Sequence, residues 1–291
     1  MPLAPLLHPR PKPPSEAPAM DSLQPTAITE AMIQAGATKA TLPPSDLLIR
    51  GTLSGALLGI ATSLALTAAV QTGQLLVGAL IFPVGFVMIV LLGLELVTGS
   101  FALLPMAVMA GKATPGQMMT NWSWVLLGNL IGSVLYAILF VIAVTNAWQI
   151  APAGVAQRVV ALAEAKTIAY AALGSAGMLT VVVKAILCNW MVCMGVVMSL
   201  ASTSTIGRIA GPWMPILIFF AQGFEHTVVN MFVIPAGMMM DAKVSVADWI
   251  VWNLIPVTIG NLVGGFTLVA LAFHATFAKR TAIPSALPQE T

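Results

Sequence analysis

Charged residues are scarce in this chain of 291 residues, since Asp, Glu, Lys and Arg together make up 8% of it. A soluble domain carries about 25% charged residues. Apolar residues make up 58% of the chain, and the mean hydropathy is +0.95. These values exclude an ordinary soluble enzyme and indicate an integral membrane protein in contact with a lipid bilayer. The chain also has no basic patch interleaved with aromatic residues, which excludes nucleic acid as a partner.

Residue types that build metal and catalytic centres are also few. The two cysteines, Cys188 and Cys193, lie five residues apart inside one apolar stretch, so they do not form a CxxC pair. Two ligands do not complete a zinc site. The chain has neither a glycine-rich phosphate loop nor an HExxH motif. We therefore expect small reduced cysteines in the core, no cofactor and no enzymatic activity.

Proline is concentrated near the N-terminus, where scattered charges accompany it and no apolar run of a secretory signal occurs. This composition predicts a cytoplasmic tail over residues 1–47 that is disordered or loosely helical. An amphipathic piece near Ala27–Ala37 that lies at the membrane interface is the alternative. Residues 48–278 are expected to form the transmembrane domain. Residues 279–291 are expected to form a second, short cytoplasmic tail.

Six apolar stretches are each long enough to cross a bilayer, which takes about 20 helical residues. Polar residues and glycine interrupt the second and fifth stretches near their centres, at Glu95–Gly99 and Gln222–His226. Such interruptions are tolerated where the backbone lines a cavity walled by protein. The sequence therefore predicts an all-α protein with six spans, of which the second and fifth are broken. The spans are placed near 51–72, 76–110, 119–148, 168–202, 212–240 and 247–277.

The distribution of Lys and Arg predicts the orientation, because cytoplasmic loops carry more of them. The cytoplasmic segments would hold Arg10, Lys12, Lys39, Arg50, Lys112, Arg208, Lys279 and Arg280, and the outer loops would hold Arg158, Lys166 and Lys243. We expect both termini to be cytoplasmic and the membrane to be a bacterial inner membrane.

Rare polar and proline positions recur along the chain at a shift of 130 to 132 residues. Three spans in each half mean that the halves enter the membrane from opposite sides, which makes an inverted repeat. Such folds place the substrate near the midplane, between the two broken helices. The matched pairs are Pro83 with Pro215, Glu95 with Glu225, Asn121 with Asn253 and Asn129 with Asn261.

A glutamate and a histidine, Glu225 and His226, are adjacent at the centre of the broken fifth span. Ionisable residues at bilayer depth are costly and usually mark a substrate path. Glu225 has a repeat mate in Glu95, so we expect both to be structural, bonding backbone donors at the helix breaks. His226 matches Leu96 and has no polar mate, which favours a functional role. The alternative is a polar residue satisfied by Thr98 and the backbone.

Three motifs resemble those of the formate/nitrite transporter family: Lys184–Trp190, Gly223–His226 followed by Asn230–Phe232, and Glu95–Gly99. The resemblance covers nearly all of residues 50–277. It implies a homopentamer whose aquaporin-like protomers each hold one channel for small monovalent anions. It also implies His226 as the central residue with Thr98 and Asn230 nearby, an outer constriction of Phe82 and Phe219, an inner one at Leu96, and Lys184 in a vestibule.

A bare anion in an apolar constriction bears a large desolvation cost, whereas a neutral acid bears much less. A histidine between two constrictions would donate a proton, or a strong hydrogen bond, to the anion. We therefore expect proton-linked passage of formate or nitrite. Hydrosulfide and bicarbonate make similar demands and remain alternatives. A neutral-solute aquaporin-like pore is the other alternative, although the paired Asn-Pro-Ala motifs of such pores are absent.

Overall fold

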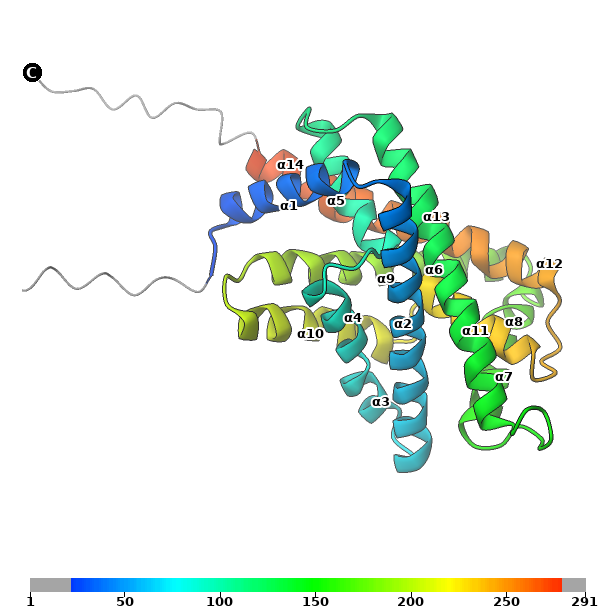
Figure 1. The fold of residues 1–291 in the computed structure, drawn as a ribbon. Coiled ribbons are helices and arrows are strands. Elements are labelled where there is room, and N and C mark those ends of the chain that lie inside the picture. Colours follow the sequence, from blue (N-terminus) through cyan, green and yellow to red (C-terminus); the bar gives the residue numbers. More distant parts are fainter. Residues whose placement is uncertain (1–21, 279–291) are drawn as a thin grey trace, which may run out of the picture.

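The computed structural model of the protein describes residues 22–278, and all the long elements in this range are helices (Figure 1). By length and composition, four helical runs are suited to crossing a membrane. They are α2 (Pro44–Thr72), α6 (Pro115–Val144), α9 (Ser175–Leu200) and a final run over Val246–Phe277. The final run comprises α12 (Val246–Trp249), η1 (Ile250–Leu254), α13 (Ile255–Gly265), η2 (Phe266–Leu271) and α14 (Ala272–Phe277).

Shorter apolar helices occupy the predicted second and fifth spans. The second span is built from α3 (Leu75–Ile81), α4 (Pro83–Leu91) and α5 (Val97–Met109), and the fifth from α10 (Thr205–Ala221) and α11 (Thr227–Met238). Gly93 and Gly223 have φ angles of 64° and 62° where the first segments end. Glycine adopts this left-handed conformation without the steric cost of a Cβ. The predicted breaks in helices two and five, and the order of elements in each half, are thereby confirmed.

An N-terminal helix, α1 (Pro25–Ala40), lies in the predicted tail. The prediction of disorder is wrong for this segment, whereas the alternative of an amphipathic piece near Ala27–Ala37 falls within the helix. One face of α1 is buried, and Met32 and Ile33 pack in a cluster with Leu103 and Met106 of α5. The N-terminal prolines that favour disorder end at Pro25. Pro25 is in the first turn of α1, where proline is tolerated. Residues 1–21 and 279–291, which hold the rest of the predicted tails, lie outside the described residues.

A helix in the second half corresponds to α1. Helix α7 (Val155–Ala165), followed by the short α8 (Ile168–Ala171), precedes α9 as α1 precedes α2. Helix α7 packs on α11, the second part of its broken span, just as α1 packs on α5. The repeat therefore contains an additional helix in each half that hydropathy does not reveal.

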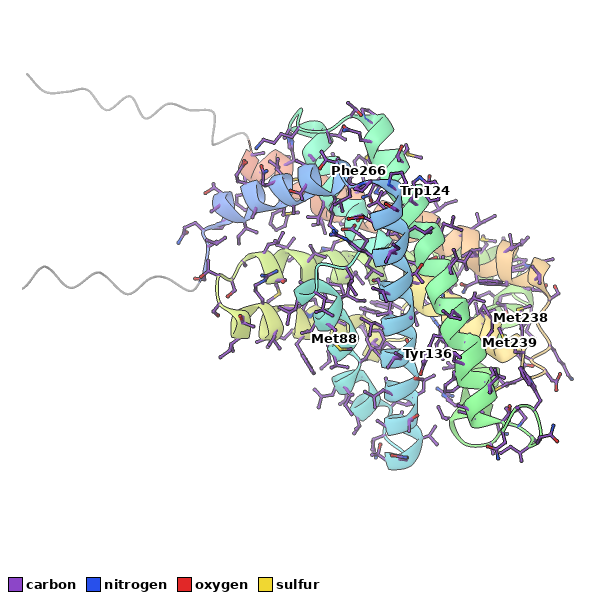
Figure 2. The ribbon with its side chains drawn as sticks, in the orientation of Figure 1. Met88, Trp124, Tyr136, Met238, Met239 and Phe266 are labelled. Atoms are coloured by element: carbon purple, nitrogen blue, oxygen red, sulfur yellow. The ribbon has the colours of Figure 1, made fainter. Side chains whose placement is uncertain are left out.

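Helices α2 and α6 run in close contact along their small residues. A Cβ at Gly132 would overlap the carbonyl oxygen of Thr52, and one at Gly55 would overlap the carbonyl oxygen of Asn129. Small residues at such positions let helix backbones approach in membranes. Farther along the same interface, Tyr136 shares a hydrogen bond of 2.6 Å with Ser63 (Figure 2). This contact holds α6, and with it Asn129, against the first span.

Gly132→Leu is expected to lower the free energy of unfolding by about 3 kcal/mol, because an overpacked contact must move backbone. Thermal unfolding of the protein in detergent measures the change. The control is Gly116→Ala in the first turn of α6, where a Cβ would meet only Thr114 Oγ1 at 3.8 Å. A Gly132→Leu protein as stable as this control would contradict the close approach of the two helices.

Candidate functional site

The site is centred on the N-termini of α5 and α11, the helices that follow the breaks in the second and fifth spans. Leu96 and His226 are the N-cap residues of α5 and α11, and both have extended backbones. The Nδ1 atom of His226 accepts a hydrogen bond of 3.2 Å from the backbone N–H of Val229. Its Nε2 atom lies 3.1 Å from Oγ1 of Thr98, in the first turn of α5. The two breaks thus bring together the histidine and the hydroxyl that the sequence paired.

The hydrogen bonds assign the proton of the neutral imidazole. Because Nδ1 accepts from Val229, the ring proton is on Nε2, which donates to Thr98 Oγ1. Within residues 22–278 the Thr98 hydroxyl makes no other side-chain hydrogen bond, so its own O–H is free to donate. A threonine hydroxyl held by a histidine is a hydrogen-bond donor suited to an anion.

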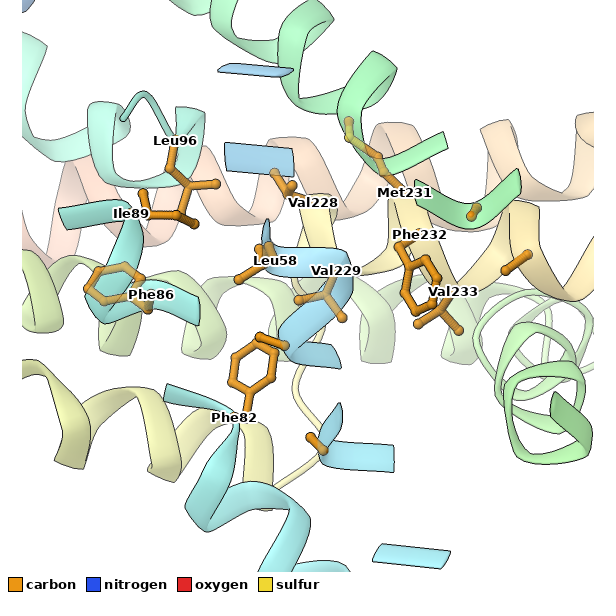
Figure 3. Packing of buried hydrophobic residues seen from close by; sticks show 14 of the residues in the cluster. Leu58, Phe82, Phe86, Ile89, Leu96, Val228, Val229, Met231, Phe232 and Val233 are labelled. Carbon is orange, nitrogen blue, oxygen red and sulfur yellow. The ribbon is translucent and has the colours of Figure 1, made fainter. Parts of the chain in front are cut away.

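Apolar residues bound this pair on both sides. The ring of Phe219 stacks on His226 with centroids 5.6 Å apart, and it meets Phe82 edge-on at 5.6 Å. Phe82 also points toward Leu58 and Val229 (Figure 3). On the other side of the pair, Leu96 lies close to Ile89. His226 and Thr98 are buried between these groups. The polar pair therefore lies among apolar side chains, at the positions where the sequence predicts two constrictions.

Two cavities approach the constrictions from opposite sides. The α1-side cavity has a volume of about 350 Å³, and its walls include Leu96, Lys39 and Arg208. The α7-side cavity has a volume of about 160 Å³, and its walls include Phe219, Lys166 and Arg158. The two cavities share no wall residue, and neither includes His226 or Thr98. The polar pair is therefore closed off from both.

Two asparagines related by the repeat clamp the breaks. The Oδ1 atom of Asn129 accepts from Val97 N–H at 3.0 Å, and its Nδ2 donates to the carbonyl of Glu95 at 2.9 Å. Asn261 makes the same two bonds, to Thr227 N–H and to the carbonyl of Glu225, each 2.9 Å long. Each side chain satisfies backbone groups that the broken helix leaves free. The same pair of hydrogen bonds therefore fixes the backbone around Leu96 and around His226.

The two glutamates at the breaks form ion pairs, so the prediction that they bond backbone donors is wrong. Glu95 accepts from Lys39 at 2.7 Å, and Glu225 accepts from Lys166 at 2.9 Å. The backbone donors next to them are already bonded by Asn129 and Asn261, and a buried carboxylate needs a paired cation. Both glutamates still lie at the helix breaks, where the sequence places them.

The two ion pairs differ in how fully the carboxylate is bonded. Glu225 also accepts from the hydroxyl of Tyr170 at 2.9 Å and from Nδ2 of Asn230 at 2.8 Å. Glu95 has one buried oxygen, Oε2, that has no partner within the described range. The Glu225 cluster is therefore the more firmly bonded of the two.

Two predicted site residues make contacts that the sequence does not indicate. Lys184 lines neither of the two cavities, and its ammonium lies 5.7 Å from the ring centroid of Tyr170. The lysines on cavity walls are Lys39 and Lys166, each just before the first span of its half and 127 residues apart in the sequence. That shared position is the signal that would have found them. The side chain of Asn230 belongs to the Glu225 cluster and does not bond the His226 imidazole, whereas its backbone N–H donates to the carbonyl of His226 at 3.0 Å.

The described residues hold no group of three His, Cys, Asp or Glu side chains that could bind a metal ion. Cys188 and Cys193 are both free and buried. The thiol of Cys193 donates to the carbonyl of Thr98 at 3.3 Å.

Comparison with known families places these features in context. The model of the family described as "Formate/nitrite transporter" matches residues 26–275. The chain belongs to the formate/nitrite transporter family. The chain is therefore a multi-pass integral membrane protein and not an enzyme.

Several relatives extend over most of the chain. An uncharacterised transporter, YrhG, of Bacillus subtilis (strain 168) is 34% identical, over 88% of this chain and 94% of its own. The formate channel BtFdhC of Bacillus thuringiensis is 32% identical, over 88% and 96%. The formate channel FocA of Escherichia coli (strain K12) is 30% identical, over 89% and 96%.

Solved structures of the formate/nitrite transporter family show the same fold. An FNT family ion channel superposes with a TM-score of 0.74 at 28% identity, covering 86% of this chain and 99% of its own. A pentameric formate channel with formate bound gives a TM-score of 0.65 at 24% identity, covering 81% and 98%. These likenesses confirm the predicted fold class.

Proposed function

We propose that the chain conducts small monovalent weak-acid anions, formate or nitrite, with proton linkage at His226. The observation that carries this proposal is the His226–Thr98 pair, buried at 3.1 Å between an apolar constriction at Leu96 and another at Phe82 and Phe219. The path runs from the α1-side cavity through both constrictions to the α7-side cavity. The formate channels among the relatives support the same class of substrate.

Each cavity has one arginine without an ion pair among the described residues, Arg208 in the α1-side cavity and Arg158 in the α7-side cavity, and this charge draws anions toward the path. In the α1-side cavity the walls hold Lys39, Arg50 and Arg208 against one acid, Glu95. In the α7-side cavity they hold Arg158 and Lys166, with no acid among the wall residues. Charge of one sign in a cleft with low-dielectric walls raises the local concentration of the opposite ion. An anion therefore reaches each constriction at a raised concentration.

At the centre the free O–H of Thr98 donates to the anion while His226 Nε2–H holds the threonine oxygen. This bond replaces part of the hydration that the anion loses between the constrictions. Transfer of a proton requires an imidazole that carries a second proton on Nδ1, which would displace the N–H of Val229. The donated hydrogen bond is thus the resting interaction. In the proton-linked event one anion and one proton cross together as one molecule of neutral acid.

The chain's assembly and orientation complete the proposal. We expect a homopentamer in a bacterial inner membrane, with both termini cytoplasmic, so that the α1-side cavity opens to the cytoplasm. Large apolar side chains such as Ile131, Leu135 and Leu139 are exposed along α6, which suits contact with lipid or with a neighbouring protomer.

Flux into liposomes that contain the purified protein tests this function. Formate and nitrite are expected to enter faster as the pH falls, because more of each crosses as neutral acid. Chloride, which stays charged, is expected to be slower by about tenfold or more, equivalent to about 1.4 kcal/mol of barrier. Empty liposomes correct for acid that crosses the lipid directly.

The same experiment includes the alternatives. Faster flux of hydrosulfide or bicarbonate than of formate and nitrite would assign the path to those anions. Glycerol flux without formate flux would overturn the proposal in favour of a neutral-solute pore. Equal rates for chloride and formate at every pH would overturn the proton linkage.

A further inference from the structure

Asn189 on α9 is a buried amide that contacts both arms of the site. Its Nδ2 donates to the carbonyl of Thr98 at 3.1 Å and to the carbonyl of Asn261 at 2.6 Å. The opposite amide orientation would set its oxygen against two carbonyl oxygens, so the orientation is fixed. Its Oδ1 is buried without a partner in the described part of the chain. The side chain is thus held entirely by its two donated bonds.

The repeat sets Asn189 apart from the other buried asparagines. Asn129 pairs with Asn261 and Asn121 with Asn253, and each makes bonds like those of its mate. In the first span of each half, Asn129 and Asn261 donate to the carbonyls of Gly51 and Ala185, which are 134 residues apart, so Asn189 corresponds to Gly55. His226 likewise corresponds to Leu96. Asn189 therefore has no counterpart in the scaffold that both halves share, and it contacts the site where the halves differ.

We propose that Asn189 is a positioning residue that sets the contact between Thr98 and His226. The inference rests on the proposed function, because it concerns the hydroxyl and imidazole that act on the anion there. Asn189 bonds only backbone carbonyls, and it makes no hydrogen bond to the Thr98 hydroxyl or to the His226 imidazole. Its effect reaches the anion through Thr98.

The bonds define how the positioning works. On one side Asn189 holds the peptide of Thr98, the residue whose hydroxyl meets His226. On the other side it holds Asn261, whose own side chain bonds the peptides immediately before and after His226. One amide group therefore joins the two helix starts across the path. Without this amide, no side chain among the described residues bonds both the Thr98 backbone on α5 and the Asn261 backbone on α13. The 3.1 Å contact between Thr98 Oγ1 and His226 Nε2 would then lose this support.

The side chain of Asn189 is packed closely against Gly265 and Cys193. A Cβ at Gly265 would lie 2.8 Å from Asn189 Nδ2 and 2.9 Å from the sulfur of Cys193. The Cys193 thiol is a second, weaker donor to the carbonyl of Thr98. When Asn189 is replaced by an apolar residue of similar size, Cys193 keeps that carbonyl bonded, so the fold survives while the tie across the path is lost.

The test compares Asn189→Leu, Thr98→Val and the double variant in liposomes, with formate and chloride as the probes. Asn189→Leu is expected to lower formate flux about tenfold or more, to flatten its pH dependence and to reduce selectivity over chloride, because small misplacements of a reacting group have effects of this size. In the Thr98→Val background the same substitution is expected to add less than about twofold, since residues that act through one group are not additive.

The matched control is Asn121→Leu. Asn121 is equally buried and donates to the carbonyl of Lys39, but it has no bond to Thr98 or His226. It is expected to lose thermal stability while its formate flux keeps the pH dependence of the unmodified protein. If Asn189→Leu does not assemble, Asn189→Ser, whose hydroxyl is too short to bridge both carbonyls, carries the same expectation.

The outcomes separate this inference from the function on which it rests. Unchanged flux and selectivity in Thr98→Val would overturn the proposed function. An impaired Thr98→Val with an Asn189→Leu that keeps its pH profile and selectivity would overturn the positioning role alone. Additive losses in the double variant would also overturn it, since they would show that Asn189 acts independently of Thr98.

Discussion

His226→Phe is expected to abolish the pH dependence of formate flux and to lower the flux about tenfold or more at every pH, because the barrier rises by at least about 1.4 kcal/mol. Phenylalanine fills the same space and can still stack on Phe219. It has neither the Nε2 donor that holds Thr98 nor the Nδ1 acceptor that caps α11. An anion at the centre then lacks a fixed donor. The measurement is formate and chloride flux across a pH series in liposomes.

His226→Asn separates the chemistry of the ring from its capping role. Asparagine is a good N-cap residue and can accept from Val229 N–H in place of Nδ1. Loss of the cap in His226→Phe is expected to lower the free energy of unfolding by about 1 kcal/mol, and asparagine avoids that loss. Both variants are expected to lose the pH dependence. A His226→Asn channel with unchanged pH profile and selectivity would assign His226 a capping role only.

Glu225→Leu is expected to lower the free energy of unfolding by about 3 to 5 kcal/mol, because it leaves a buried cation without its partner. Lys166 has a side-chain exposure of 14%, so solvent replaces little of the lost interaction. The substitution also removes the acceptor for Tyr170 and Asn230. Thermal unfolding in detergent measures the change.

Glu95→Leu is the matched control for this prediction. Glu95 has the same place in the other half and pairs with Lys39, which is more exposed and lies on the wall of the larger cavity. Its second oxygen has no partner in the described range, so fewer bonds are lost. We expect Glu95→Leu to be the milder change. A Glu225→Leu protein that is the more stable of the two would contradict the importance of the extra bonds at Glu225.

The sequence predicts the scaffold well because its signals are local or strictly repeated. Polar residues and glycine inside apolar stretches predict the helix breaks, and the matched Asn129 and Asn261 predict interhelical bonding at both. The contact between Thr98 and His226 is also predicted, because an inverted repeat brings the breaks of the two halves together. These features depend on residue type and spacing, which the sequence contains directly.

Other features depend on contacts between distant residues. Lys39 and Lys166 read as loop cations, yet each reaches a carboxylate 56 or 59 residues away. Asn189 contacts residues 91 and 72 positions distant, so spacing does not indicate its role. The sequence indicates helix α1 only weakly, as an amphipathic piece near Ala27–Ala37 that follows a proline-rich segment. Its buried face becomes evident only against Leu103 and Met106 of α5.

The shared clamp at the two breaks has a consequence for how such a protein can diverge. Leu96 and His226 cap their helices with nearly the same backbone geometry, and equivalent asparagines fix the peptides around them. The backbone at each cap is therefore fixed mainly by its asparagine, and the side chain of the cap residue adds a capping bond only at His226. Which half carries the imidazole is then independent of how the halves fold. Polarity in a duplicated membrane protein can thus change by a few substitutions at the caps, with no change in architecture.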